Sequence, residues 1–131
     1  MILEAFAKIN WSLDITGKRD DGYHELRTVM QMTALNDSLV LEKKREPGVR
    51  LGTNLPDLPN DSGNIAYRAA ELMIRTFGID NGVSIKITKR IPVAAGMAGG
   101  STDCAAAIKA VNQIFELGLS EKELMDICVK L

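Results

Sequence analysis

The stretch Arg90-Ile-Pro-Val-Ala-Ala-Gly-Met-Ala-Gly-Gly-Ser-Thr-Asp103 decides how this sequence is interpreted. Before it, residues 83–89 alternate apolar and polar side chains, which is the period of a half-buried strand. After it, apolar side chains recur at helical spacing between Cys104 and Phe115. The sequence therefore predicts a glycine-rich loop that joins a strand to a helix.

The glycines of this loop indicate a site for an anion. Gly96, Gly99 and Gly100 lack a β-carbon, so the backbone can take positive φ and approach a ligand closely. The unpaired N–H groups and the positive dipole at the start of the next helix favour phosphate. A plain turn is the alternative, because a strand–glycine–helix passage is a weak signal by itself.

The loop fits neither of the two common nucleotide motifs. No lysine follows the last glycine, as a Walker A loop requires. The spacing also misses the dinucleotide fingerprint, and we expect no parallel βαβ unit around the loop. Hydroxyls and a carboxylate follow at once in Ser101-Thr102-Asp103. They either cap the helix or reach a phosphate-bound Mg²⁺.

Composition places the chain among ordinary globular domains. It has 131 residues, of which 46% are hydrophobic and 25% charged, and its net charge is −1. Bulk charge therefore gives no reason to expect nucleic acid or a membrane surface as a partner, and no apolar run is long enough for a membrane span. Cys104 and Cys128 fall on apolar helix faces, which favours reduced, buried thiols and a cytoplasmic protein. A single His without CxxC or HExxH gives no case for zinc.

The N-terminal segment, residues 6–15, alternates as a strand. We expect its apolar face to seek the core, with Lys8 and Asn10 side by side on the other face. An ordinary solvated face is the alternative interpretation of these two residues. The apolar face consists of Ile9, Trp11, Leu13 and Ile15.

A polar connection over residues 16–22 leads to Tyr23 and His24. An aromatic ring beside an imidazole can stack on a base and hydrogen-bond to it. The alternative is a tyrosine that anchors a loop, with the histidine in solvent.

The remaining elements follow from periodicity and turn signals. We expect strands at residues 27–33, 38–43 and 49–51, with Asn36-Asp37 as a turn between the first two. A loop over 53–63 precedes a helix that Asn64 or the residue before it caps and Gly78 ends. Ser120-Glu-Lys-Glu123 starts a last helix, whose apolar stripe runs into the final residue without a stop signal. We therefore expect an α+β layer, a mostly antiparallel sheet covered on one face by helices, in a chain that is part of a longer protein.

Three separated pieces together resemble the GHMP small-molecule kinases. They are Ala7-Lys8-Ile9-Asn10, then Gly17-Lys-Arg-Asp-Asp-Gly-Tyr-His24, and then Pro92-Val-Ala-Ala-Gly-Met-Ala-Gly-Gly-Ser-Thr-Asp103. The glycine motif is shared by the whole family. The first two pieces resemble the branch that uses ATP to phosphorylate the 2-hydroxyl of 4-diphosphocytidyl-2-C-methyl-D-erythritol in isoprenoid precursor synthesis. The resemblance implies a ribosomal protein S5 domain 2-like fold, with residues 1–131 as the N-terminal, ATP-binding domain.

The resemblance also implies roles for individual residues. Lys8 would be the catalytic lysine, Asn10 would place the erythritol end, and Tyr23 with His24 would hold the cytosine. Mg²⁺ would arrive with ATP and could reach Ser101 or Thr102. The residues implied in ATP binding are Asn64, Pro92, Val93, Ala94, Ala95, Gly96, Met97, Ala98, Gly99, Gly100, Ser101 and Thr102.

The sequence departs from the family pattern in two ways. Met97 and Thr102 stand where Leu and Ser are usual, and both changes keep shape or hydroxyl. Relatives also carry a Gly-x-Asp-Val-Pro segment, whose Asp is the catalytic base, and a second domain that these residues lack. We therefore expect the 131 residues alone not to turn over. Another GHMP kinase, acting on a mevalonate-type or sugar substrate, and a non-catalytic nucleotide-binding module are the alternatives.

Overall fold

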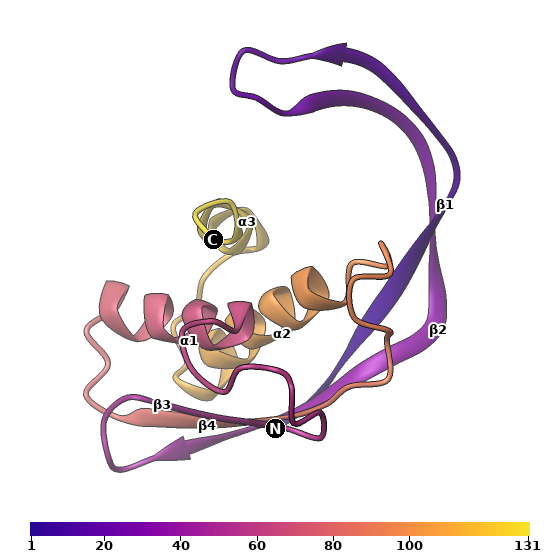
Figure 1. Cartoon of the computed structure of the whole chain (residues 1–131). Helices are drawn as coiled ribbons and strands as arrows, with labels where there is room; N and C mark the ends of the chain where they lie inside the picture. Colours follow the sequence, from indigo (N-terminus) through magenta and orange to yellow (C-terminus); the bar gives the residue numbers. More distant parts are fainter.

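The computed structural model describes all residues 1–131 and forms a four-stranded sheet with helices on one side (Figure 1). The strand order is β1-β2-β4-β3, and only the β3–β4 pair is parallel. The expected α+β layer with a mostly antiparallel sheet is therefore confirmed. In chain order the elements are β1 (Ile2–Lys18), β2 (His24–Lys44), β3 (Val49–Thr53), α1 (Ile65–Thr76), β4 (Gly82–Thr88), α2 (Gly99–Ile114) and α3 (Glu121–Cys128).

The core lies between the sheet and helices α1 and α2. Alternate residues Val83, Ile85 and Ile87 of β4 are buried, as the period of two predicts. Burying each such side chain contributes about 1.5–3 kcal/mol relative to leaving it exposed. The helices face them with small residues, which allow the backbones to approach the sheet closely: Ala66, Ala69, Ala70, Ala107 and Ala110. This packing sets the start of α2 above the end of β4.

Two helix starts follow the sequence closely. The Asn64 side chain accepts a hydrogen bond from the Ala66 N–H at 3.0 Å and so caps α1. Ser120 and Glu123 form a reciprocal capping box at α3.

None of the three helices has the length and apolar character that a membrane crossing requires. Cys104 is buried and Cys128 half-buried, both as free thiols.

The expectation that no parallel βαβ unit surrounds the glycine loop is wrong. Strand β3 pairs in parallel with β4, and α1 connects the two, so a βαβ unit comes directly before the loop. The βαβ unit could not be predicted from the sequence because β3 has only five residues. Its partner β4 begins about 30 residues later, and no local pattern reports pairing at that distance.

The predicted turn at Asn36-Asp37 is also wrong. Strand β2 runs through both residues, and Asp37 is fully buried opposite Ala5 of β1. The backbone N–H groups of Arg90 and Ile91 donate to the Asp37 carboxylate at 2.5 and 2.9 Å. These tertiary hydrogen bonds override the turn preference of an Asn-Asp pair.

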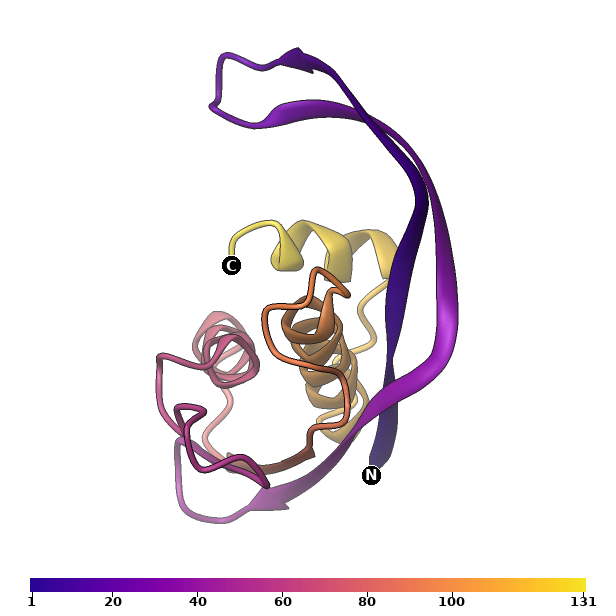
Figure 2. The ribbon, with the colours of Figure 1, turned by 45° about the vertical axis from the view of Figure 1, so that its right-hand side comes forward.

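Strands β1 and β2 extend past the body as a curved two-stranded arm (Figures 1 and 2). The expectation that Trp11, Leu13 and Ile15 face the core is therefore wrong, since all three are exposed, Trp11 at 72%. On β1 only Ala5 and Ala7 are buried, where α2 covers the ribbon. Irregularities in the pairing after Phe6, Asn10 and Ile15 also break the alternation along the arm. Alternation shows which side chains share a face, but not whether anything covers that face.

Candidate functional site

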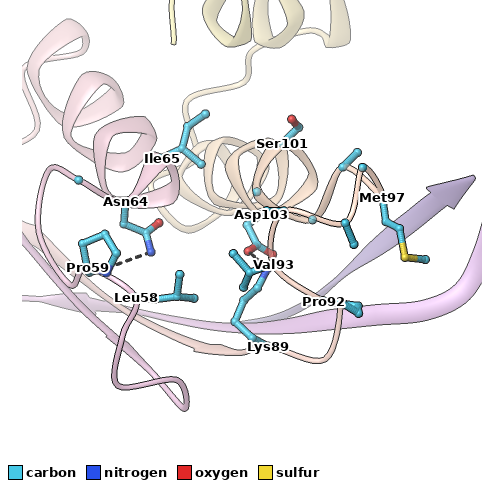
Figure 3. A pocket seen from close by; sticks show the side chains of 17 residues that line it. Leu58, Pro59, Asn64, Ile65, Lys89, Pro92, Val93, Met97, Ser101 and Asp103 are labelled. Atoms are coloured by element: carbon cyan, nitrogen blue, oxygen red, sulfur yellow. Dashed lines mark hydrogen bonds and ion pairs between the residues drawn. The ribbon is translucent and has the colours of Figure 1, made fainter.

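A cavity of about 390 Å³ lies between the glycine loop and the start of α1 (Figure 3). Every residue from 92 to 101 lines it, which includes all the loop positions that the resemblance implies except Thr102. Asn64 also lines it, although its side chain is already bonded to the Ala66 N–H and the Pro59 carbonyl. The remaining lining residues are Leu58, Pro59, Gly63, Ile65, Lys89 and Asp103.

The loop backbone turns at three left-handed positions. Gly96 has φ of +70°, as expected for a glycine at a sharp bend. Ala94 and Ala98 also have positive φ, at 59° and 63°. Such conformations are costly for residues with a β-carbon and gather at ligand sites. Except for Met97, residues 94–100 carry no side chain larger than a methyl group, so the backbone of the bend can come close to a ligand.

Helix α2 begins earlier than the hydroxyl residues suggest. Its first residue is Gly99 and its cap position is Ala98, which offers no side-chain hydrogen bond. Of the two alternatives for Ser101 and Thr102, the one in which they cap the helix is therefore wrong. The Thr102 hydroxyl donates backward to the carbonyls of Ala98 and Gly99, whereas the Ser101 side chain is exposed at the cavity. The structure brings no group of three or more His, Cys, Asp or Glu side chains together as a metal site.

Lys8 lies against the bend of the loop. Its ammonium Nζ donates to the Gly96 carbonyl at 2.8 Å, and its backbone N–H donates to the Met97 carbonyl at 3.1 Å. None of the ion pairs in the structure includes this lysine. An ammonium without a carboxylate partner thus stands beside a loop suited to phosphate. The catalytic role that the resemblance implies for Lys8 stays a prediction.

The other implied substrate residues lie on the arm, away from the cavity. Asn10 is exposed, and its amide oxygen accepts a hydrogen bond from the Thr28 hydroxyl at 3.3 Å. Tyr23 is 75% exposed in the connection at the tip of the arm, and His24 begins β2 there. The structure brings none of these three residues into the cavity.

Sequence reasoning missed a cluster of buried charges next to the cavity. The Lys89 ammonium forms ion pairs with Asp37 and, at 2.7 Å, with Asp103. The Lys89 side chain is only 6% exposed. Figure 3 shows Lys89 and Asp103 meeting beside Val93. The sequence did contain a partial signal, since Lys89 directly precedes the loop and Asp103 ends it. It contained no signal for Asp37, which belongs to the distant strand β2.

Burial sets the protonation of this cluster. It raises the pKa of Asp103 to about 6, against the lowering effect of the Lys89 ion pair. Burial also acts to lower the pKa of Lys89, but the two carboxylates outweigh it and leave that pKa raised. The Oδ1 atom of Asp103 is buried without a hydrogen-bond partner. The Asp103 carboxylate therefore titrates near pH 6.

The two adjacent glycines of the loop are expected to respond oppositely to alanine. A β-carbon on Gly99 would come within 3.1 Å of Ile91 and 3.3 Å of the Lys89 ammonium, whereas one on Gly100 would meet Ile65 at an ordinary 3.7 Å. We expect Gly99→Ala to destabilise the fold by about 1 kcal/mol or more through overpacking. Gly100→Ala should stabilise it by about 0.5–1 kcal/mol, as alanine does in a helix. Urea unfolding measures both, and equal shifts would contradict the close packing at Gly99.

Comparison with known proteins adds relatives that share both sequence and fold. A protein from Acetivibrio thermocellus named 4-diphosphocytidyl-2-C-methyl-D-erythritol kinase is 58% identical over 95% of this chain. One of the same name from Caldicellulosiruptor bescii is 52% identical over 97% of it. The chain spans 44% of each relative's length. A crystal structure of 4-(cytidine 5'-diphospho)-2C-methyl-D-erythritol kinase superposes on 98% of this chain and 46% of its own, with a TM-score of 0.77 and 35% identity.

More distant structures share the fold alone. A mevalonate kinase structure reaches a TM-score of 0.72 at 18% identity, over 98% of this chain and 45% of its own. A model of the GHMP kinases N terminal domain matches residues 64–131, slightly more than half of the chain. The matched segment contains the glycine loop and the helices on either side of it. On this evidence the chain belongs to the GHMP kinase family.

Proposed function

We propose that residues 1–131 are the ATP-binding domain of a kinase that phosphorylates the 2-hydroxyl of 4-diphosphocytidyl-2-C-methyl-D-erythritol. The observation that carries the proposal is the Lys8 ammonium, 2.8 Å from the Gly96 carbonyl of a loop with three left-handed residues. The names of relatives 52–58% identical supply the substrate. Because the chain spans less than half of those relatives, we assign the catalytic base and the rest of the substrate site to a second domain.

In this proposal the loop and α2 hold the triphosphate. Phosphoryl transfer needs positioning and charge neutralisation more than covalent chemistry from the protein. The loop backbone and the uncapped start of α2 present N–H groups and a positive dipole to the phosphate oxygens. Lys8 places a positive charge at the outer end of the phosphate chain, where negative charge moves during transfer.

Magnesium would be held mainly by the phosphates. Mg²⁺ usually keeps several waters and takes only one or two protein oxygens. The Ser101 hydroxyl is exposed at the cavity, whereas the Thr102 hydroxyl is bonded to its own helix. We therefore assign Ser101, rather than Thr102, as the hydroxyl that reaches the ion. The bound ion would neutralise phosphate charge during transfer.

The arm is assigned to the cytidine end of the substrate. Tyr23 is 75% exposed, so its ring is free to stack on a base, and His24 is the next residue in the chain. Asn10 lies between this tip and Lys8 along β1, as a residue that orients the erythritol moiety would. These assignments rest on the resemblance and on exposure, since the arm does not reach the cavity.

Two measurements test the proposal. Calorimetry should detect ATP binding to the 131-residue chain, while ADP release with 4-diphosphocytidyl-2-C-methyl-D-erythritol should stay at background. A protein that carries this chain together with the remaining length of its relatives should phosphorylate that substrate and reject mevalonate and homoserine. If the chain did not bind ATP, the proposed ATP site would be wrong. Substrate-dependent ADP release by the chain alone would contradict the need for a second domain. Turnover of mevalonate would contradict the proposed substrate.

A further inference from the structure

One buried carboxylate fixes the entrance of the glycine loop. Asp37, on β2, is fully buried and does not line the cavity. Its Oδ1 accepts from the backbone N–H groups of Arg90 and Ile91, the first two residues after Lys89. Its Oδ2 accepts from the Lys89 ammonium. Three successive residues, Lys89, Arg90 and Ile91, are thus held by one side chain that lies 52 residues away from Lys89 in sequence.

The same contacts extend to the exit of the loop. Lys89 also donates to Asp103 at 2.7 Å, in the first turn of α2. An ionic chain from Asp37 through Lys89 to Asp103 therefore ties the two ends of the loop to each other and to β2. Asp37 pairs with Ala5 of β1, three positions before Lys8, whose ammonium contacts the bend at Gly96. The β1–β2 pair thus holds the loop at its entrance and at its bend.

Stability alone is a poor explanation for such a cluster. Buried ion pairs are frequently no more stabilising than apolar side chains of the same volume, because both charges lose their hydration. The core around this site is otherwise built from aliphatic residues and alanines. The cluster is better explained by its effect on the loop, because Asp37 fixes the orientation of the backbone at Arg90 and Ile91.

We propose that Asp37 is a positioning residue for nucleotide binding, which sets the phosphate-binding conformation of residues 90–101 from outside the cavity. The inference rests on the proposed function, because it concerns the same ATP site. Asp37 acts through the loop and touches no phosphate. Its removal should therefore weaken ligands that need the loop, and spare ligands that use only the apolar wall of the cavity around Leu58 and Ile65.

The test compares ATP with adenosine. Asp37→Asn keeps one oxygen for the backbone N–H groups but removes the charge that holds Lys89. We expect its Kd for ATP to rise about tenfold or more, because the loop must then be ordered on binding. The Kd for adenosine should stay within about threefold. Calorimetry with both ligands gives the ratio of the Kd for ATP to the Kd for adenosine. A general loosening of the fold would weaken both ligands alike and leave this ratio unchanged.

A stability control separates positioning from folding. Leu39→Ala removes a buried side chain two residues along the same strand, at a position that does not line the cavity. It should lower the melting temperature and leave the ATP-to-adenosine ratio unchanged. The inference is overturned if Asp37→Asn gives the same ratio as Leu39→Ala. Failure of the unmodified chain to bind ATP would overturn the proposed function together with it, which is a different result.

A milder variant decides the case if Asp37→Asn does not fold. Asp103→Asn leaves the Asp37 contacts to Arg90 and Ile91 in place and weakens the far end of the ionic chain, at a residue that also lines the cavity. We expect it to raise the ATP Kd about threefold relative to adenosine, in the same direction as Asp37→Asn. An unchanged ratio in Asp103→Asn would then count against the inference.

Discussion

Replacing Lys8 with alanine is expected to lower kcat for phosphoryl transfer about 10²–10³-fold, the usual effect of removing one preorganised charge or donor. The Kd for ATP should change by less than about threefold, because the loop backbone and the start of α2 still hold the phosphates. The backbone N–H of residue 8 can also still donate to the Met97 carbonyl, which keeps the bend attached to β1. The Lys8 ammonium bonds to the Gly96 carbonyl and to no carboxylate, so its charge is available to the transferring phosphoryl group. Steady-state kinetics and calorimetry measure both quantities, in a protein with the full length of the relatives.

The control for this prediction is another lysine. Lys86 of β4 is exposed between the buried Ile85 and Ile87, so Lys86→Ala removes the same charge from the outer face of the sheet. It should leave kcat and the Kd for ATP unchanged. If Lys8→Ala raised the Kd for ATP by as much as it lowered kcat, Lys8 would be a ground-state binding residue instead. An unchanged kcat would remove it from the reaction.

Local sequence signals predicted the elements that surround the site. The alternation at Val83, Ile85 and Ile87 predicted β4, and all three side chains are buried. Asn64 predicted the start of α1, and the glycine-rich stretch predicted the bend at Gly96. Each of these features depends on neighbours within a few residues, which is why propensity and periodicity report them.

Long-range contacts were not readable in the same way. Asn36-Asp37 has the composition of a turn, yet Asp37 is in the middle of a strand because Lys89, Arg90 and Ile91 supply its hydrogen bonds. The apolar face of Trp11 alternates as a core strand would, yet it lies on an arm that no helix covers. Asp37 depends on partners that are distant in sequence, and the face of Trp11 has no covering element at all. A short sequence window shows neither fact.

The buried ion cluster makes the second large prediction. Lys89→Met keeps the length of the apolar stem and removes the ammonium, which leaves Asp37 and Asp103 buried without their counter-charge. Breaking a buried pair by removing one partner typically costs about 3–5 kcal/mol. We expect a loss of that size in the free energy of unfolding at about pH 8, measured with urea. Lys86→Met, the matched exposed change, should stay within about 0.5 kcal/mol.

The loss should shrink as the pH falls, and Asp103 determines the direction. Its pKa is about 6 in the folded chain against an ordinary value of 3.8, so the folded state binds this proton more tightly than the unfolded state. The contribution of this group to stability therefore increases as the pH falls through about 6 toward 4. Without Lys89, which lowers the Asp103 pKa, that pKa moves further up and a proton neutralises the cluster at a higher pH. The variant should thus recover part of its stability between about pH 8 and pH 5, relative to Lys86→Met. A loss of equal size at both pH values would mean that the uncompensated charge of the two carboxylates is not what destabilises the variant.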